Sequence, residues 1–146
     1  MSAVELFHLG IKALIVDPEA KILLLKVNLE ELSGYEGSAY WDIPGGRVNK
    51  GDSMLDTLTR EIAEETGIKW EGPADQIGTV QSKIRVPTDR GDVALALVVY
   101  RCRVARRPDI RLSEEHVEWR WMDSNEAAAA LDTKYPPEFC ELLRKF

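Results

Sequence analysis

The chain has 146 residues, of which 45% are hydrophobic and 30% are charged, a composition typical of a folded globular protein and not of a disordered or fibrous one. The formal net charge is −6, from 19 Lys and Arg residues against 25 Asp and Glu residues, so we expect no binding of a nucleic acid polymer through its backbone. The length suits one domain, residues 1–146, with one hydrophobic core.

The sequence also indicates the cellular compartment in which the protein is expected. No apolar run is long enough to span a bilayer, and the first ten residues lack the basic start and long apolar centre of a signal peptide. Cys102 and Cys140 lie far apart and form no metal-binding spacing, so two free thiols are favoured over a disulfide. We therefore expect a cytoplasmic protein with no membrane partner.

The first part of the chain predicts a β-hairpin. Apolar, β-prone runs at residues 9–17 and 20–27 flank the turn signal DPEA. Residues 27–40 are polar, contain two glycines and predict a loop. A short strand at residues 40–43 should stop at Pro44, and the two glycines that follow predict a turn or loop.

A helix is well marked over residues 53–66. Its predicted apolar face repeats at spacings of three and four: Leu55, Leu58 and Ile62. Either Asp52 or Ser53 can cap its N-terminus, and Gly67 can cap its C-terminus.

The rest of the chain predicts three strands and two helices. The strands are expected at residues 77–86, 94–104 and 116–122, with a hairpin loop at 87–92 between the first two. The helices are expected at residues 124–132, beginning on Ser124, and 136–146, beginning on its prolines. Strands and helices in this order predict an α/β or α+β domain with helices packed on a sheet.

Three glutamates of the marked helix, Glu61, Glu64 and Glu65, have the spacings i, i+3 and i+4 and so share one face. Hard cations such as Mg²⁺ or Mn²⁺ prefer oxygen ligands and bridge to phosphate oxygens, so this face can serve as a metal platform. The alternative is an ordinary solvated helix, in which Arg60 and Glu64 form an exposed i, i+4 pair.

The surrounding pattern is more specific than the glutamates alone. It has Gly46, five residues, Asp52, seven residues, and then the run REIAEETGI from Arg60 to Ile68. This pattern resembles the signature of the MutT-like Nudix hydrolase family: G, five residues, E, seven residues, REUxEExGU, where U is a bulky aliphatic residue. Only Asp52 departs from the fixed positions, since the family has glutamate there. Asp52 is one methylene shorter, so it would reach Arg60 less well, or act mainly as an N-cap.

The resemblance implies an α/β fold, a Nudix-type α/β/α sandwich around a central mixed sheet. It also implies hydrolysis of a pyrophosphate bond in a nucleoside diphosphate linked to another moiety, with Mg²⁺, or alternatively Mn²⁺, as cofactor. By analogy the cations are held by Glu61, Glu64, Glu65 and the backbone carbonyl of Gly46. Arg60 pairs with a carboxylate of the motif and orients it. A nucleotide-binding or regulatory module with little catalysis is the alternative, and Asp52 is the feature that favours it.

A second acidic segment, residues 112–123, resembles a part of many Nudix proteins in which a glutamate binds a metal or acts as general base. Glu115 fits that role best and Glu114 next, although a solvated acidic loop is an equal alternative. His116 is expected to be a structural, hydrogen-bonding residue. Trp121 is expected in the core, with base stacking by Trp119 as a minor alternative.

The small-molecule substrate is expected to be a nucleoside triphosphate or a related nucleotide. Three cations, Lys83, Arg85 and Arg90, could meet its phosphates, but exposed charges at a strand edge are the favoured interpretation. Three aromatic residues near the motif could stack a base: Tyr35, Tyr40 and Trp41. Exposed aromatics near Trp70 or Tyr135 could mark a homodimer contact.

Overall fold

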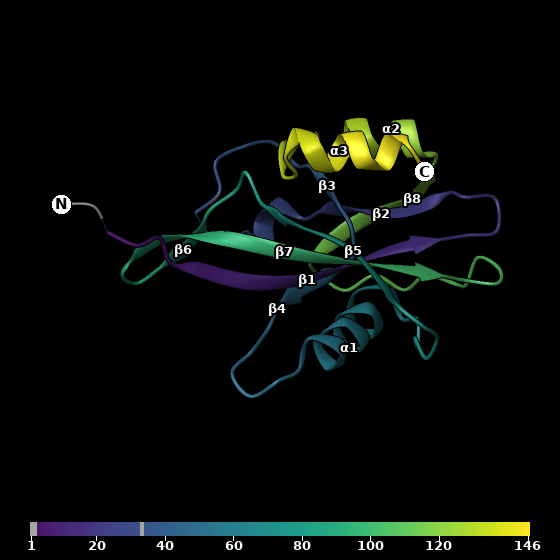
Figure 1. Ribbon diagram of the computed structural model, residues 1–146, viewed down its shortest axis with the longest axis horizontal. Coiled ribbons are helices and arrows are strands. Elements are labelled where there is room, and N and C mark those ends of the chain that lie inside the picture. The colour runs from purple at the N-terminus through teal and green to yellow at the C-terminus, as the bar shows by residue number, and fades with distance from the viewer. Residues whose placement is uncertain (1–2, 33) are drawn as a thin grey trace.

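The computed structural model describes residues 3–32 and 34–146. In this part of the chain, eight strands form one mixed sheet, with helix α1 (Met54–Thr66) on one face and α2 (Ser124–Ala130) and α3 (Pro137–Arg144) on the other (Figure 1). Ser33, which lies in the predicted loop, is outside the described residues. The layers are those of the expected α/β/α sandwich.

The sheet is ordered β3-β2-β1-β7-β5. The bounds of these strands are Trp41–Asp42 for β3, Ile22–Val27 for β2, Phe7–Val16 for β1, Gly91–Arg103 for β7 and Asp75–Gln81 for β5. Three further strands attach to it: β4 (Gly45–Arg47) to β1, β6 (Val86–Thr88) to β7, and β8 (His116–Met122) to β2. The pair β1 and β7 is parallel, and the other pairs are antiparallel.

The two strands of the predicted N-terminal hairpin, β1 and β2, separate soon after their turn. They pair at Val16 and Ile22, and further along the segment that contains β3 and β4 enters between them. In this segment β3 pairs with β2 and β4 pairs with β1. The prediction of a turn or loop at Gly45 and Gly46 is therefore wrong, because both residues continue the sheet as part of β4.

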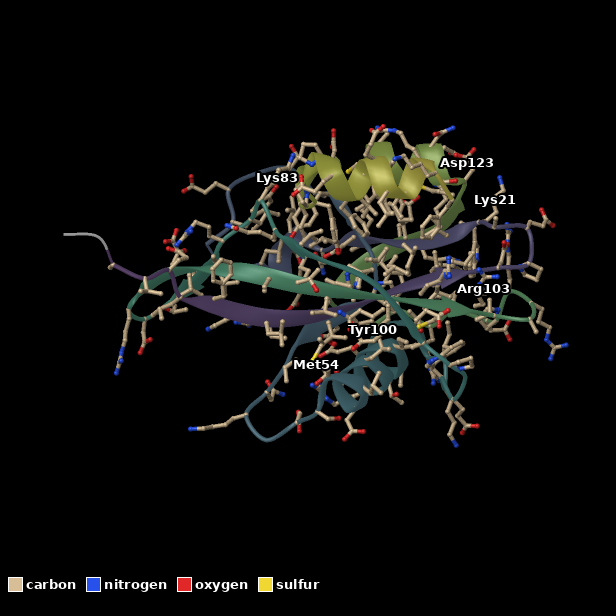
Figure 2. The ribbon with its side chains drawn as sticks, viewed as in Figure 1. Lys21, Met54, Lys83, Tyr100, Arg103 and Asp123 are labelled. Carbon is tan, nitrogen blue, oxygen red and sulfur yellow. The ribbon has the colours of Figure 1, made fainter. Side chains whose placement is uncertain are left out.

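Alternation of side chains along the central strands divides the core into two clusters. On β1, Ile11, Ala13 and Ile15 pack with Leu58 and Ile62 of α1. The opposite side of the sheet packs against α2 and α3 through a second set, which includes Leu14, Leu24, Leu97, Tyr135 and Phe139. Figure 2 shows Met54 and Tyr100 on the α1 side of the sheet.

Helix α1 lies where the apolar spacing predicts it. The side chain of Ser53 accepts a hydrogen bond from the backbone N–H of Asp56, so Ser53 and not Asp52 is the cap, and Gly67 ends the helix at φ 78°. Leu55 is 56% exposed, so its assignment to the apolar face is wrong. In the first turn Met54 packs against the core in its place.

Two further predictions are corrected in the second half of the chain. The strand expected over residues 77–86 is interrupted after Gln81, because the buried Ser82 hydroxyl accepts from the N–H of Ile84 and donates to the carbonyl of Lys134. The helix expected from Ser124 is capped one residue earlier by Asp123, whose side chain forms a capping box with Glu126.

Other predictions concern single residues. Cys102 and Cys140 are free, as expected, and both are buried. Tyr135 is fully buried, so the idea that it marks an exposed dimer contact is wrong. No helix in the described residues combines the length and the apolarity needed to cross a membrane.

Candidate active site

The segment that contains β3 and β4 lies between β1 and β2 in the sheet, and at β4 its backbone packs directly against α1. Gly45 has φ 154°, and a Cβ atom there would collide with the carbonyl oxygen of Ile11. Its N–H donates a 2.9 Å hydrogen bond to Oε1 of Glu65. A Cβ on Gly46 would lie 2.5 Å from Cδ of Glu61. Gly45 is therefore required by the close approach of the β1 backbone, and Gly46 by the Glu61 carboxylate of α1.

The three glutamates of α1 differ in exposure. Glu65 is buried, the side chain of Glu61 is 12% exposed, and that of Glu64 is 57% exposed. Glu61 and Glu65 thus face the glycine segment, whereas Glu64 lies at the solvent edge of the same helix face. The helical spacing places all three near one another, but it does not reveal this gradient in burial.

Arg60 holds the outer carboxylates together. Its Nη1 lies 3.0 Å from Oε1 of Glu61 and 3.7 Å from Oε2 of Glu64. Its Nη2 lies 3.7 Å from Oδ2 of Asp52. The shorter side chain of Asp52 therefore still reaches Arg60 as an ion pair, although at the long end of the range for such a contact.

The acidic segment before β8 supplies two more polar groups to this place. One ligand atom from each of Glu65, Glu115 and His116 lies within 4.8 Å of the others. Glu114 is exposed and uses its backbone carbonyl to accept a hydrogen bond from the side chain of Asn28. Of the two glutamates considered in this segment, Glu115 is the one that reaches α1.

The electrostatics of the cluster favour neutral groups in the absence of a cation. Burial, with the neighbouring carboxyl of Glu115, raises the pKa of Glu65 to about 9. Burial, with the charge of Glu64, also raises the pKa of Glu61. Burial and the charge of Lys12 lower the pKa of His116 to about 4. Carboxyls with raised pKa values gathered at one point match the donor set that a divalent cation would bind.

Glu65 and Glu115 border a cavity of about 470 Å³ between the separated strands. His116, Lys12 and Lys134 also line it, and the charge of Lys12 opposes the rise in the pKa of Glu65. Both lysines contact Oδ2 of the buried Asp42, at 3.0 Å from Lys12 Nζ and 2.7 Å from Lys134 Nζ. These cations lie far outside the glutamate motif, and inspection of the sequence missed them as site residues.

The cations and aromatics considered for substrate contact are distributed unevenly. Arg85 lines the cavity and pairs with Glu5 at 2.7 Å and with Asp92 at 3.2 Å. Lys83 and Arg90 are exposed and do not line it. Tyr35 and Tyr40 line it and pack edge to face, with ring centroids 5.3 Å apart.

The tryptophans lie outside this cavity. The charged groups of Lys26 and Arg120 lie over the ring of Trp41. Trp121 packs against the α1-side cluster, as expected, whereas Trp119 is 45% exposed.

Comparison with known proteins agrees with this architecture. Residues 6–143 match the family described as NUDIX domain. The protein named bis(5'-nucleosyl)-tetraphosphatase (asymmetrical) of Mus musculus is 32% identical over 98 residues, which is 66% of this chain and 64% of that protein. The nucleoside triphosphatase NudI of Enterobacter sp. (strain 638) is 29% identical over 96 residues, 63% of this chain and 67% of that protein.

Among solved structures, the MutT protein from Methanosarcina mazei Go1 superposes with a TM-score of 0.74 at 28% identity. The superposition covers 99% of this chain and 95% of that one. The similarity in structure thus spans nearly the whole chain, whereas the sequence match to the mouse protein spans less than two thirds of that protein's length.

Proposed function

The chain belongs to the NUDIX domain family, and from this we propose that it hydrolyses a pyrophosphate bond in a small nucleotide with the help of Mg²⁺ or Mn²⁺. The observation that carries the proposal is a set of carboxylates beside the cavity: Glu61 and Glu65 lie against Gly46 and Gly45, and Glu115 has a carboxylate oxygen within 4.8 Å of one of Glu65. A nucleoside triphosphate or a dinucleoside polyphosphate fits the named relatives.

Glu61, Glu64 and Glu65, with the carbonyl of Gly46, would hold the divalent cation. A bound cation would supply Lewis acidity for a phosphoryl group and for water. Glu115 lies next to Glu65, lines the cavity and is exposed, so it could act as the general base that accepts a proton from the attacking water. Arg60 keeps the Glu61 carboxylate oriented through its 3.0 Å contact.

The test is release of phosphate and pyrophosphate from a panel of nucleoside triphosphates and dinucleoside polyphosphates, with Mg²⁺ or Mn²⁺. We expect turnover of at least one panel member, and its loss with a chelator. Glu65→Gln should lower the rate by about 100-fold or more. Glu71→Gln is the matched control, because Glu71 is 76% exposed and pairs only loosely with Lys69 at 3.8 Å.

A folded protein that binds nucleotides but turns over no panel member would contradict the proposal. It would support the alternative of a nucleotide-binding or regulatory module. Asp52→Glu, which restores the residue of the family motif, would then be the first variant to assay.

A further inference from the structure

The floor of the cavity carries two buried lysines on a single carboxylate. Lys12 is 6% exposed, Lys134 is 9% exposed and Asp42 is 4% exposed. Both ammonium groups contact the same oxygen, Oδ2 of Asp42, while Oδ1 accepts a 2.6 Å hydrogen bond from the hydroxyl of Tyr135. Among the described residues, neither lysine has another ion-pair partner.

This arrangement leaves one positive charge uncompensated within the set. Burying an unpaired charge is unfavourable, and a second lysine on one carboxylate adds to that cost. Lys12 also acts on Glu65 through its charge, but among the described residues it forms no ion pair with that carboxyl. A set of two cations and one anion can accept one further anion from a bound ligand, which would balance the charges. The charges of Lys12 and Lys134 also outweigh the burial of Asp42 and keep its pKa below the ordinary value.

Hydrogen-bonding capacity points the same way. An ammonium group has three N–H donors. Lys12 donates to Asp42 and to the carbonyl of Ile43 at 3.1 Å, and Lys134 donates to Asp42. The described contacts therefore leave donors on both lysines without an acceptor. Both residues line the cavity, so an acceptor group of a bound molecule can reach them.

We propose that Lys12 and Lys134 form an oxyanion subsite on the cavity floor, and that this subsite takes a phosphate group of the substrate other than the phosphate held at the α1 carboxylates. The inference rests on the proposed function for the identity of the substrate. It adds that the preferred substrate has at least two separately bound phosphates. Lysine binds phosphate as a point charge, so the subsite selects for charge and not for a particular base.

The first experiment needs no catalysis. Binding of inorganic pyrophosphate to chelator-treated, metal-free protein is measured by calorimetry at physiological ionic strength. We expect the dissociation constant to rise by about tenfold or more in Lys134→Met and in Lys12→Met, because a charge-assisted hydrogen bond is lost in each. Lys134→Arg keeps the charge and should retain most of the binding.

Lys83→Met is the matched control. Lys83 is exposed, does not line the cavity and lies on the α2 and α3 side of the sheet (Figure 2), although its backbone N–H donates to the carbonyl of Lys134. Its removal takes away the same charge from the same neighbourhood, so equal weakening in Lys83→Met would overturn the proposal in favour of general electrostatic attraction. Unchanged binding in both floor variants would overturn it as well.

Folding of the variants is protected by the shared partner. After loss of either lysine, Asp42 keeps the other lysine and Tyr135, so each single variant should remain folded. If one of them does not fold, the other still decides the question. In the second experiment, the floor variants should weaken binding of a nucleoside diphosphate more than binding of the matching monophosphate, which has no second phosphate for the subsite. An equal effect on both nucleotides would contradict a subsite for an additional phosphate.

The two experiments separate the two proposals. Pyrophosphate binding that depends on the lysines, in a protein without turnover, would keep the subsite and remove the proposed enzymatic function. Turnover that is lost in Glu65→Gln but unaffected in both lysine variants would keep the function and remove the subsite.

Discussion

Gly46 determines how closely the Glu61 carboxylate can approach the sheet. A Cβ at this position would lie 2.5 Å from Cδ of Glu61, so Gly46→Ala must displace that side chain. We expect metal affinity and turnover to fall, the latter by about 100-fold if the carboxylate moves by an ångström. Calorimetric titration with Mn²⁺ and steady-state kinetics measure the two effects.

The control for this substitution is Gly78→Ala. An added Cβ at Gly78 meets no atom within 4 Å, so metal affinity and turnover should match the parent protein. Wild-type metal affinity in Gly46→Ala would show that Glu61 can bind the cation from a different position.

Glu65 makes a prediction about pH and stability in the metal-free protein. Its pKa is raised from an ordinary 4.5 to about 9, mainly by burial. The folded state therefore keeps a proton that the unfolded chain releases between these two values, and the free energy of unfolding falls as pH rises through that window. For this one group the slope is at most about 1.4 kcal/mol per pH unit.

Urea unfolding in chelator between about pH 6 and 8.5 measures this effect. Glu65→Gln removes the titrating group, so the variant should gain stability relative to wild type as pH rises. Saturating Mg²⁺ should reverse the trend in wild type, because the cation binds the ionised carboxylate. Parallel curves for wild type and Glu65→Gln in chelator would refute the assigned shift.

At the scale of the element, α1 shows how far periodicity alone can be used. The spacing of Leu55, Leu58 and Ile62 and the cap at Gly67 are sufficient to predict the helix and its bounds within a residue. The spacing and the cap do not show which of these apolar side chains of α1 are covered by the sheet. Leu58 is 1% exposed and Leu55 is 56% exposed, although both occupy apolar positions of the same pattern.

This difference has a measurable consequence. Leu58→Ala should lower the free energy of unfolding by about 2–5 kcal/mol, because it leaves a cavity between α1 and β1. Leu55→Ala should change it by no more than about 0.5 kcal/mol. Chemical denaturation of both variants gives the comparison, and similar losses in the two would mean that Leu55 is covered in solution.

The segment around β4 could not have been predicted from local signals. Pro44 and two glycines predict a break, and the chain does turn from β2 toward β1 at this point. Gly45 and Gly46 are nevertheless in a strand, because the opened edge of β1 offers hydrogen-bond partners that lie more than thirty residues away in sequence. Gly46 allows the close approach of Glu61 on α1, and Gly45 that of the β1 backbone, and local propensity encodes neither tertiary requirement.

At the scale of the whole molecule, the sequence predicts the metal-binding face and misses the lysines and the aspartate that line the same cavity. Glu61, Glu64 and Glu65 are neighbours on one helix, so a spacing rule finds them. Lys12 lies in β1, Asp42 in β3 and Lys134 in the segment before α3. Lys12 and Asp42 are 30 positions apart in the sequence, and Asp42 and Lys134 are 92 positions apart. Only the folded sheet, and the packing of the C-terminal segment against it, brings them together.

The same network joins β1 and β3 to the segment before α3, so Asp42 should matter for the stability of the molecule as a whole. Asp42→Asn removes the only carboxylate that either lysine contacts among the described ion pairs, and leaves two buried cations side by side. We expect a loss of about 3–5 kcal/mol in the free energy of unfolding, as for removal of one partner from a buried ion pair. Guanidinium denaturation measures the loss.

Asp75→Asn is the control for this last substitution, because Asp75 is 65% exposed and lies 3.8 Å from Arg101. That variant should lose no more than about 1 kcal/mol. Added pyrophosphate should restore part of the stability of Asp42→Asn, because the ligand brings a negative charge to the two lysines and binds only the folded state. Stability of Asp42→Asn equal to wild type without any anion would mean that water already reaches and solvates the two ammonium groups.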